Sequence, residues 1–161
     1  MGSGSSSSYS GTSGGSQPYA PFYHVEEKMH QGDIKSGVFH DGHYDKNPTA
    51  ENLKDKIHGN YIGNKNTNIE VPYVIDMNNN IIIGRRNGNG RGKGTLPTPH
   101  PTLIGGKDPK VQMAGILGIN GGKIAWYNNN SGHYKPNKQS MELADKIFGQ
   151  LPKSLFKKKG K

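Results

Sequence analysis

Four short apolar runs in the middle of the chain constrain the fold most strongly. Residues 71–76 and 81–86 form one pair, separated by a Met-Asn-Asn-Asn turn, and residues 111–119 and 123–127 form a second pair across an Asn-Gly-Gly turn. Apolar runs joined by short turns rich in Asn and Gly are typical of β-hairpins. These segments predict an antiparallel sheet built from two or more hairpins.

Helical spacing of apolar residues predicts two helices before this sheet. The first has apolar residues at positions 22, 25 and 29 and ends at Gly32. The second begins at Asn47-Pro48 and ends at Gly59. Asn is a favoured N-cap residue, and proline suits the first helical turn because the N–H it lacks needs no partner there.

One more helix is predicted after the sheet, capped by Asn137 and carrying apolar residues on one face as far as Leu151. The predicted fold class is therefore α+β: an antiparallel sheet of two or more hairpins, flanked by N-terminal helices and a C-terminal helix.

The composition divides the chain into three parts. Residues 1–16 are rich in Gly and Ser and indicate a linker or the remnant of an expression vector, residues 17–152 are expected to form a single folded domain, and residues 153–161 are a basic tail. There are no cysteines, which excludes disulfides, thiolate metal sites and a cysteine nucleophile. No apolar run reaches membrane-spanning length, so we expect no membrane insertion, and we expect a monomer.

The net charge of +9 is concentrated in the second half of the chain. Residues 1–76 hold 6 lysines and 9 acidic residues, a net charge of −3, whereas residues 77–161 hold 15 basic and 3 acidic residues, a net charge of +12. A basic half of this kind favours an acidic partner, which could be nucleic acid, a nucleotide or an acidic protein.

All three arginines of the protein, Arg85, Arg86 and Arg91, flank or lie in a loop of Gly and Asn that also holds Lys93. Guanidinium groups bind phosphate well, and glycines let the backbone approach a ligand closely. We expect this loop to bind an anion; the alternative is a loop whose charges serve only solubility.

Two histidines in the basic half are candidates for acid–base chemistry. His133 is followed by Tyr134 and Lys135 just before the last predicted helix, and His100 lies between two prolines and is followed by Thr102. Imidazole is the side chain best suited to exchange protons near neutral pH. The alternatives are a histidine that caps a turn and a proline-rich connector.

Other polar residues carry weaker signals. The spacing of His40, Asp41, His43 and Asp45 is compatible with a metal, but no further ligand cluster supports it, and the sequence assigns no metal and no cofactor. Glu70 is a possible additional acid on the first predicted strand.

Three motifs within residues 73–136 carry a resemblance to a known family. They are the run His100 to Gly106 (HPTLIGG), the pair Ala114-Gly115, and the run Ser131 to Pro136 (SGHYKP). This pattern resembles the core of the plant IQ-motif calmodulin-binding proteins and their bacterial and fungal relatives. The chain has no IQ helix, so the resemblance does not imply calmodulin binding.

The overall layout, a small basic domain that follows a linker, resembles the C-terminal toxin domains of bacterial polymorphic toxin systems. The resemblance implies delivery from the producing bacterium on a larger secreted carrier, action in the cytoplasm of a target cell, and an acidic immunity protein as partner.

From these observations we hypothesise an antibacterial toxin that cleaves RNA without a metal, in which one of His100 and His133 is the base and the other is the acid. Arg85 would stabilise phosphate charge and Tyr134 would orient the substrate. Further substrate-binding residues would be Arg86, Arg91, Lys93, Thr102 and Lys135. One alternative is an ADP-ribosyltransferase or NAD hydrolase that uses NAD as substrate, with Glu70 or another acid at the ribose. The other is a non-enzymatic module that binds an acidic partner.

Overall fold

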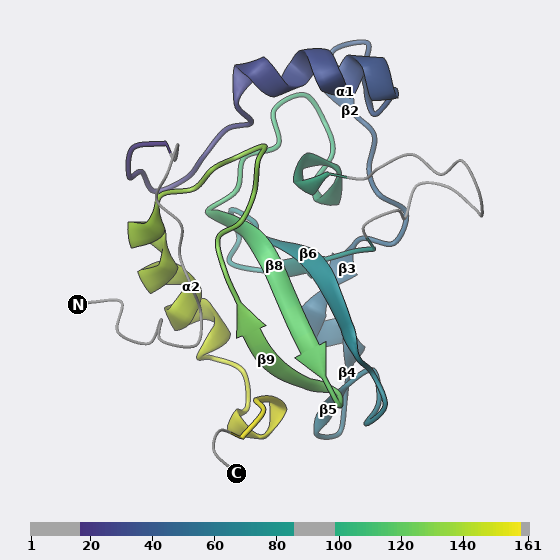
Figure 1. The fold of residues 1–161 in the computed structure, drawn as a ribbon, viewed down its shortest axis with the longest axis vertical. Coiled ribbons are helices and arrows are strands. Elements are labelled where there is room, and N and C mark those ends of the chain that lie inside the picture. The colour runs from purple at the N-terminus through teal and green to yellow at the C-terminus, as the bar shows by residue number, and fades with distance from the viewer. Residues whose placement is uncertain (1–16, 86–98, 159–161) are drawn as a thin grey trace.

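A five-stranded antiparallel sheet forms the centre of the molecule (Figure 1). The structure is a computed structural model and describes residues 17–85 and 99–158. The strand order is β3-β7-β6-β8-β9, and the α+β class predicted from the sequence is confirmed. The strands of this sheet are β3 (Glu51–Asn52), β6 (Ile69–Ile75), β7 (Ile81–Ile83), β8 (Met113–Asn120) and β9 (Lys123–Tyr127).

Both predicted hairpins are present. β6 pairs with β7, and the turn between them is held by the Asp76 carboxylate, which accepts hydrogen bonds from the backbone N–H groups of Asn78 and Asn80. β8 pairs with β9 across Gly121 and Gly122, which both have positive φ angles of 61° and 76°. β6 and β8 lie side by side along the whole of β6, so the two hairpins join into one sheet.

The two faces of the sheet are buried by different parts of the chain. On one face, Tyr73 and Tyr127 pack against Phe148 of helix α2 (Met141–Phe148). On the other face, Val74 and Ala114 pack with Tyr134 and with residues from the N-terminal segment. Since both faces are covered, the central strands are almost fully apolar.

Two small hairpins lie outside the main sheet. One consists of β1 (Phe39–His40) and β2 (His43–Tyr44), and the other of β4 (Ile57–His58) and β5 (Tyr61–Ile62). Figure 1 shows the β1–β2 hairpin beside helix α1 (His30–Ser36), at one end of the molecule.

The first predicted helix exists, but it begins and ends later than the spacing indicated. A 3₁₀ turn over Glu27–Met29 leads into α1, which ends at Gly37 rather than Gly32. Gly37 has a φ of 88°, the left-handed conformation that commonly ends a helix, whereas Gly32 keeps a helical conformation. Before Glu27 the chain is not helical, and Tyr23 forms an isolated β-bridge with Val111.

The second predicted helix, from Asn47 to Gly59, is wrong. Glu51–Asn52 forms strand β3 on the edge of the main sheet, and Leu53–Lys56 forms one 3₁₀ turn. Asn47 does not cap a helix: its amide donates to the carbonyl of Arg85, and its side-chain oxygen accepts from Thr49. Pairing with β7 therefore outweighs the local helical pattern.

The last predicted helix is confirmed. The Asn137 side chain accepts a hydrogen bond from the N–H of Gln139 and begins a 3₁₀ turn (Lys138–Ser140) that continues into α2. After α2, the turn Lys153–Leu155 returns to β9, where Leu155 is buried and Phe156 bridges to Ile124. No helix within the described residues is long and apolar enough to span a membrane.

Gly115 in β8 is predicted to be irreplaceable for packing. A Cβ atom at this position would lie 1.9 Å from the carbonyl oxygen of Asn128, which is backbone and cannot rotate away. We expect Gly115→Ala to lower the free energy of unfolding by about 1–3 kcal/mol, the usual cost of overpacking. Urea denaturation of the 161-residue chain measures this change.

Gly32→Ala is the matched control. Nothing lies within 4 Å of the corresponding Cβ position in α1, so we expect this change to raise stability by about 0.5–1 kcal/mol. Equal stability of the two variants would show that Gly115 is not required for close packing.

Candidate active site

The segment from Asn128 to Asn137 leaves β9, folds back over the sheet and carries His133. The hydroxyl of Tyr73 donates to the Asn128 carbonyl over 2.7 Å, and the Asn128 side chain accepts from the backbone N–H of Ile116 at 2.9 Å. Further along, the carbonyl of His133 accepts from the backbone N–H of Glu26. These bonds fix the backbone that presents His133.

Gln17 ties the start of the described chain to the same segment. Its backbone N–H donates to the Lys135 carbonyl, and its side-chain amide donates to the carbonyls of Tyr134 and His24. In return, the Asn137 amide donates to the Gln17 carbonyl. The N-terminal end of the described chain is therefore held against the His133 segment.

The imidazole of His133 is held by a buried carboxylate. Its Nε2 atom lies 2.9 and 3.0 Å from the two carboxylate oxygens of Asp33, and the Tyr44 hydroxyl donates to the same carboxylate. Asp33 is only 6% exposed, whereas the His133 side chain is 14% exposed. Two donors therefore satisfy a carboxylate that would be costly to bury alone.

This arrangement leaves the second nitrogen of His133 available. When Nε2 donates to Asp33, the neutral imidazole has Nδ1 as its acceptor. Within the described residues Nδ1 has no hydrogen-bond partner, and no buried side-chain nitrogen or oxygen there lacks one, so Nδ1 is in contact with solvent. A carboxylate-oriented imidazole with an open acceptor nitrogen is suited to general-base chemistry.

The environment of Tyr44 keeps its hydroxyl protonated. Burial and, to a smaller extent, the hydrogen bond to Asp33 raise the pKa of the Tyr44 phenol above its usual value. Tyr44 is therefore a permanent donor to Asp33.

Asp33 and Tyr44 were not predicted as site residues. Asp33 is 100 positions before His133 in the sequence. The first helix was expected to end at Gly32, whereas Asp33 lies inside α1. No local pattern links these residues, since the contact exists only in the tertiary structure.

His100 occupies a buried position on the 3₁₀ turn His100–Leu103. It is 8% exposed, and its Nε2 donates to the carbonyl of Gly115 over 2.7 Å. Thr102, on the same turn, is buried and donates to the carbonyl of Pro99. Both side chains hold this turn against β8 and the preceding chain.

Tyr134 belongs to the interior as well. Its ring is fully buried, its hydroxyl donates to the Pro109 carbonyl, and burial raises its pKa well above the usual value. Lys135, the next residue, is half-buried and has a positive φ of 41°, an uncommon conformation for a residue other than glycine.

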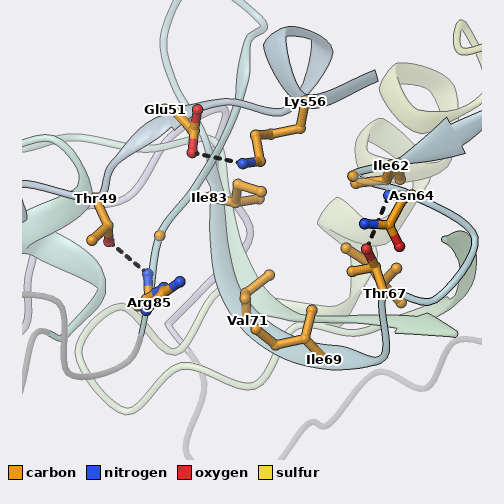
Figure 2. A pocket seen from close by; sticks show the side chains of 13 residues that line it. Thr49, Glu51, Lys56, Ile62, Asn64, Thr67, Ile69, Val71, Ile83 and Arg85 are labelled. Carbon is orange, nitrogen blue, oxygen red and sulfur yellow. Dashed lines mark hydrogen bonds and ion pairs between the residues drawn. The ribbon is translucent and has the colours of Figure 1, made fainter. Parts of the chain in front are cut away.

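Arg85 lies at a separate cavity of about 500 Å³ (Figure 2). The backbone N–H of Arg85 donates to the Thr49 hydroxyl, and Lys56 forms an ion pair with Glu51 at 3.6 Å. The apolar residues of the lining are Ile62, Ile69, Val71, Ile83 and Ile119. The cavity thus combines apolar side chains with two cationic groups and one carboxylate.

The sheet separates this cavity from His133. Arg85 follows Ile83 of β7, and β6 and β8 lie between β7 and β9, from which the His133 segment leaves. The cavity is lined by Val71 and Ile83, on the face that α2 covers, whereas Tyr134 of the His133 segment packs with Val74 and Ala114 on the other face. The described lining of the cavity includes neither His100 nor His133.

Three predicted substrate-binding residues, Arg86, Arg91 and Lys93, lie outside the described residues. Glu70 is exposed on β6 and lines a shallow depression beside Trp126, and it is not among the described residues that line the Arg85 cavity. Among the acidic residues, Glu51 is the one that shares a cavity with Arg85.

No known protein family, curated protein or solved structure matches this chain.

The Asp33–Tyr44 hydrogen bond is predicted to stabilise the fold. Tyr44→Phe removes one donor from a buried carboxylate, and we expect a loss of about 1–3 kcal/mol in the free energy of unfolding. Tyr19 is 55% exposed, and Tyr19→Phe is the matched control, for which we expect no change. Urea denaturation of both variants tests this, and equal midpoints would contradict the assignment.

Proposed function

We propose that this chain is an antibacterial toxin domain that cleaves RNA without a metal in the reaction, and that His133 is its general base. The observation that carries the proposal is the imidazole of His133, oriented by buried Asp33 with Nδ1 in contact with solvent. The net charge of +12 on residues 77–161 supports a polyanionic substrate. The resemblance of the layout to polymorphic toxin domains supports the biological setting.

In the proposed reaction, Nδ1 of His133 takes the proton from a ribose 2′-hydroxyl. The 2′ oxygen then bonds to the adjacent phosphorus, the bond from phosphorus to the 5′ oxygen breaks, and a 2′,3′-cyclic phosphate forms. Asp33 stabilises the imidazolium produced at His133, as a carboxylate does for a catalytic histidine in other hydrolases.

The leaving 5′ oxygen needs a proton, and we assign this step to His100, the other histidine of the pair predicted from the sequence. Its Nε2–H is donated to Gly115, so His100 would have to exchange that bond for one to the leaving oxygen. Lys135, two residues after His133 and half-buried, is the cation that we assign to the additional phosphate charge.

RNA cleavage by purified wild-type protein and two variants tests the proposal. We expect His133→Ala to reduce the cleavage rate by about 10²–10⁴-fold, the usual effect of losing a general base, and to abolish toxicity in bacteria. His58 is exposed on β4, and His58→Ala is the control that should keep full activity. Circular dichroism confirms folding, and full cleavage by a folded His133→Ala variant would exclude the proposal.

The Arg85 cavity supports a second candidate function, NAD hydrolysis or ADP-ribosyl transfer. Its volume of about 500 Å³ lies within the usual range for small-molecule sites, and it offers Arg85 for a pyrophosphate and Glu51 for a ribose. Loss of NAD that persists in His133→Ala and disappears in Arg85→Gln would favour this function over RNA cleavage. Absence of both activities would favour a binding module.

The proposed toxin would be delivered on a larger secreted carrier and act in the cytoplasm of the target cell. Its producer would need a neutralising partner, and the basic half predicts an acidic immunity protein that covers His133.

Association kinetics with the product of the adjacent downstream gene test this prediction. We expect the association rate to fall steeply between low and high salt, since charge attraction accelerates the encounter. His133→Ala should still bind, because the attraction comes from the surrounding charge. A basic partner, or an association rate independent of salt, would contradict it.

A further inference from the structure

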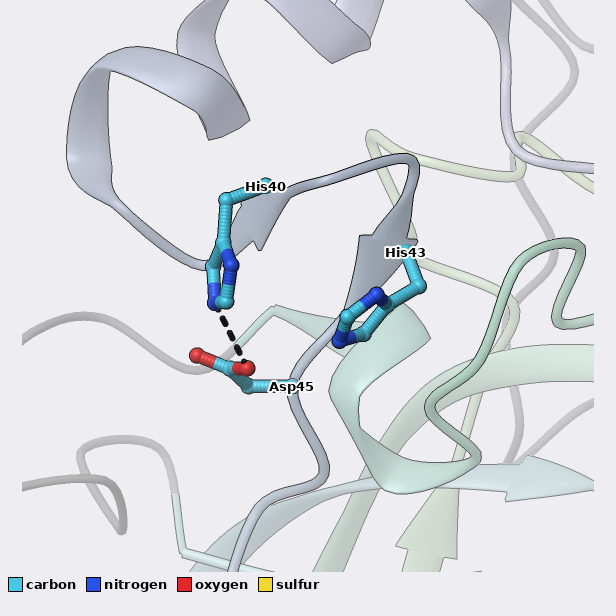
Figure 3. A group of neighbouring side chains, drawn as sticks. All are labelled: His40, His43 and Asp45. Atoms are coloured by element: carbon cyan, nitrogen blue, oxygen red, sulfur yellow. Dashed lines mark hydrogen bonds and ion pairs between the residues drawn. The ribbon is translucent and has the colours of Figure 1, made fainter.

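We propose that His40, His43 and Asp45 form a binding site for a divalent transition metal such as Zn²⁺, because the β1–β2 hairpin brings their three side chains together (Figure 3). The proposed metal is structural, and it would not contact the RNA in the reaction proposed above. The site stands independently of that function.

The side-chain geometry is close to what the metal requires. One ligand atom from each of the three residues lies within 4.8 Å of the others, and Nε2 of His40 is 2.9 Å from a carboxylate oxygen of Asp45. Ligands bound tetrahedrally to Zn²⁺ at about 2.0–2.1 Å are roughly 3.4 Å apart. Small side-chain rotations are therefore enough to close all three ligands around one ion.

The backbone that carries these ligands is well fixed. His40 and His43 are directly paired across the hairpin, and their rings are 5.2 Å apart. Tyr44 exchanges two backbone hydrogen bonds with Gly106, and the N–H of Asp45 donates to the Val38 carbonyl. Because the ligands are positioned before the metal binds, little conformational entropy is lost on binding.

Asp41 supplies a second feature typical of metal sites. Its carboxylate lies 3.3 Å from Nδ1 of His40, the ring nitrogen on the side opposite Asp45. A metal-binding histidine usually donates its other N–H to a carboxylate, which fixes the tautomer and makes the coordinating nitrogen more basic. In this arrangement Nε2 of His40 is the atom directed at the metal.

The chemistry of the donors selects the type of metal. Two imidazoles and one carboxylate suit Zn²⁺, Co²⁺ or Ni²⁺, whereas Mg²⁺ and Ca²⁺ prefer sites made only of oxygen ligands. His40 is exposed and His43 is half-buried, so water can complete the coordination. The site would therefore hold the ion with three protein ligands.

A metal in this hairpin would act on the Asp33–His133 pair. Tyr44 lies between His43 and Asp45 in the sequence, and its hydroxyl donates to Asp33, which holds His133. An ion bound by both neighbours of Tyr44 would restrict the backbone of Tyr44. This consequence for catalysis rests on the proposed function, whereas metal binding does not.

Calorimetric titration of the full chain with ZnCl₂, in the absence of RNA, tests the site directly. We expect one Zn²⁺ per chain, no binding of Mg²⁺, and the absorption spectrum of four-coordinate Co²⁺ when cobalt is used. His43→Ala and Asp45→Asn should each weaken Zn²⁺ binding by more than about 10-fold, and Asp41→Asn by about 10-fold.

His58→Ala is the matched control, since His58 is an exposed histidine on the other small hairpin and should leave Zn²⁺ binding unchanged. No Zn²⁺ binding by the folded wild-type chain would overturn the proposal. Zn²⁺ binding of unchanged affinity in both His43→Ala and Asp45→Asn would overturn it as well. Because RNA cleavage is measured separately, loss of the proposed function would not affect these outcomes.

Discussion

The close contact between the backbone of Asn128 and Gly115 determines where the His133 segment lies. Because Gly115 has no side chain, the carbonyl of Asn128 can approach β8 closely. There it accepts a hydrogen bond from the hydroxyl of Tyr73. The carbonyl of Gly115 accepts a hydrogen bond from the imidazole of His100. Two of the three sequence motifs, and the start of the segment that carries the third, therefore meet at one point of the sheet.

Beyond this point, a buried carboxylate links the N-terminal helix to the His133 segment. Asp33 receives hydrogen bonds from Tyr44 and His133, so α1, the β1–β2 hairpin and the segment after β9 are joined through one side chain. A buried carboxylate with two donors is stable only while both remain in place. The geometry of the candidate base thus depends on elements that are far apart in the sequence.

The sequence predicted the hairpins and the last helix, because their signals are local. Asn and Gly at the turns, and Asn137 as an N-cap, act on residues only a few positions away. The second helix was wrong because the segment after Asn47 pairs with β7 instead, and this long-range pairing has no local signature.

For the candidate site, too, the sequence predicted only what depends on neighbouring residues. His133 could be selected for its position before a helix, but its partner Asp33 could not, since only the folded chain brings them together. Arg85 and His133 were expected in one site, but the cavity beside Arg85 and the segment that carries His133 lie against opposite faces of the sheet. Local patterns identified reactive groups but not which of them share a site.

The attachment of Gln17 to the His133 segment has a mechanical consequence. Gln17 is bonded to Tyr134, Lys135 and Asn137. Tension applied through any chain joined ahead of Gln17 would therefore load these loop contacts before it reached the hydrogen bonds of the sheet.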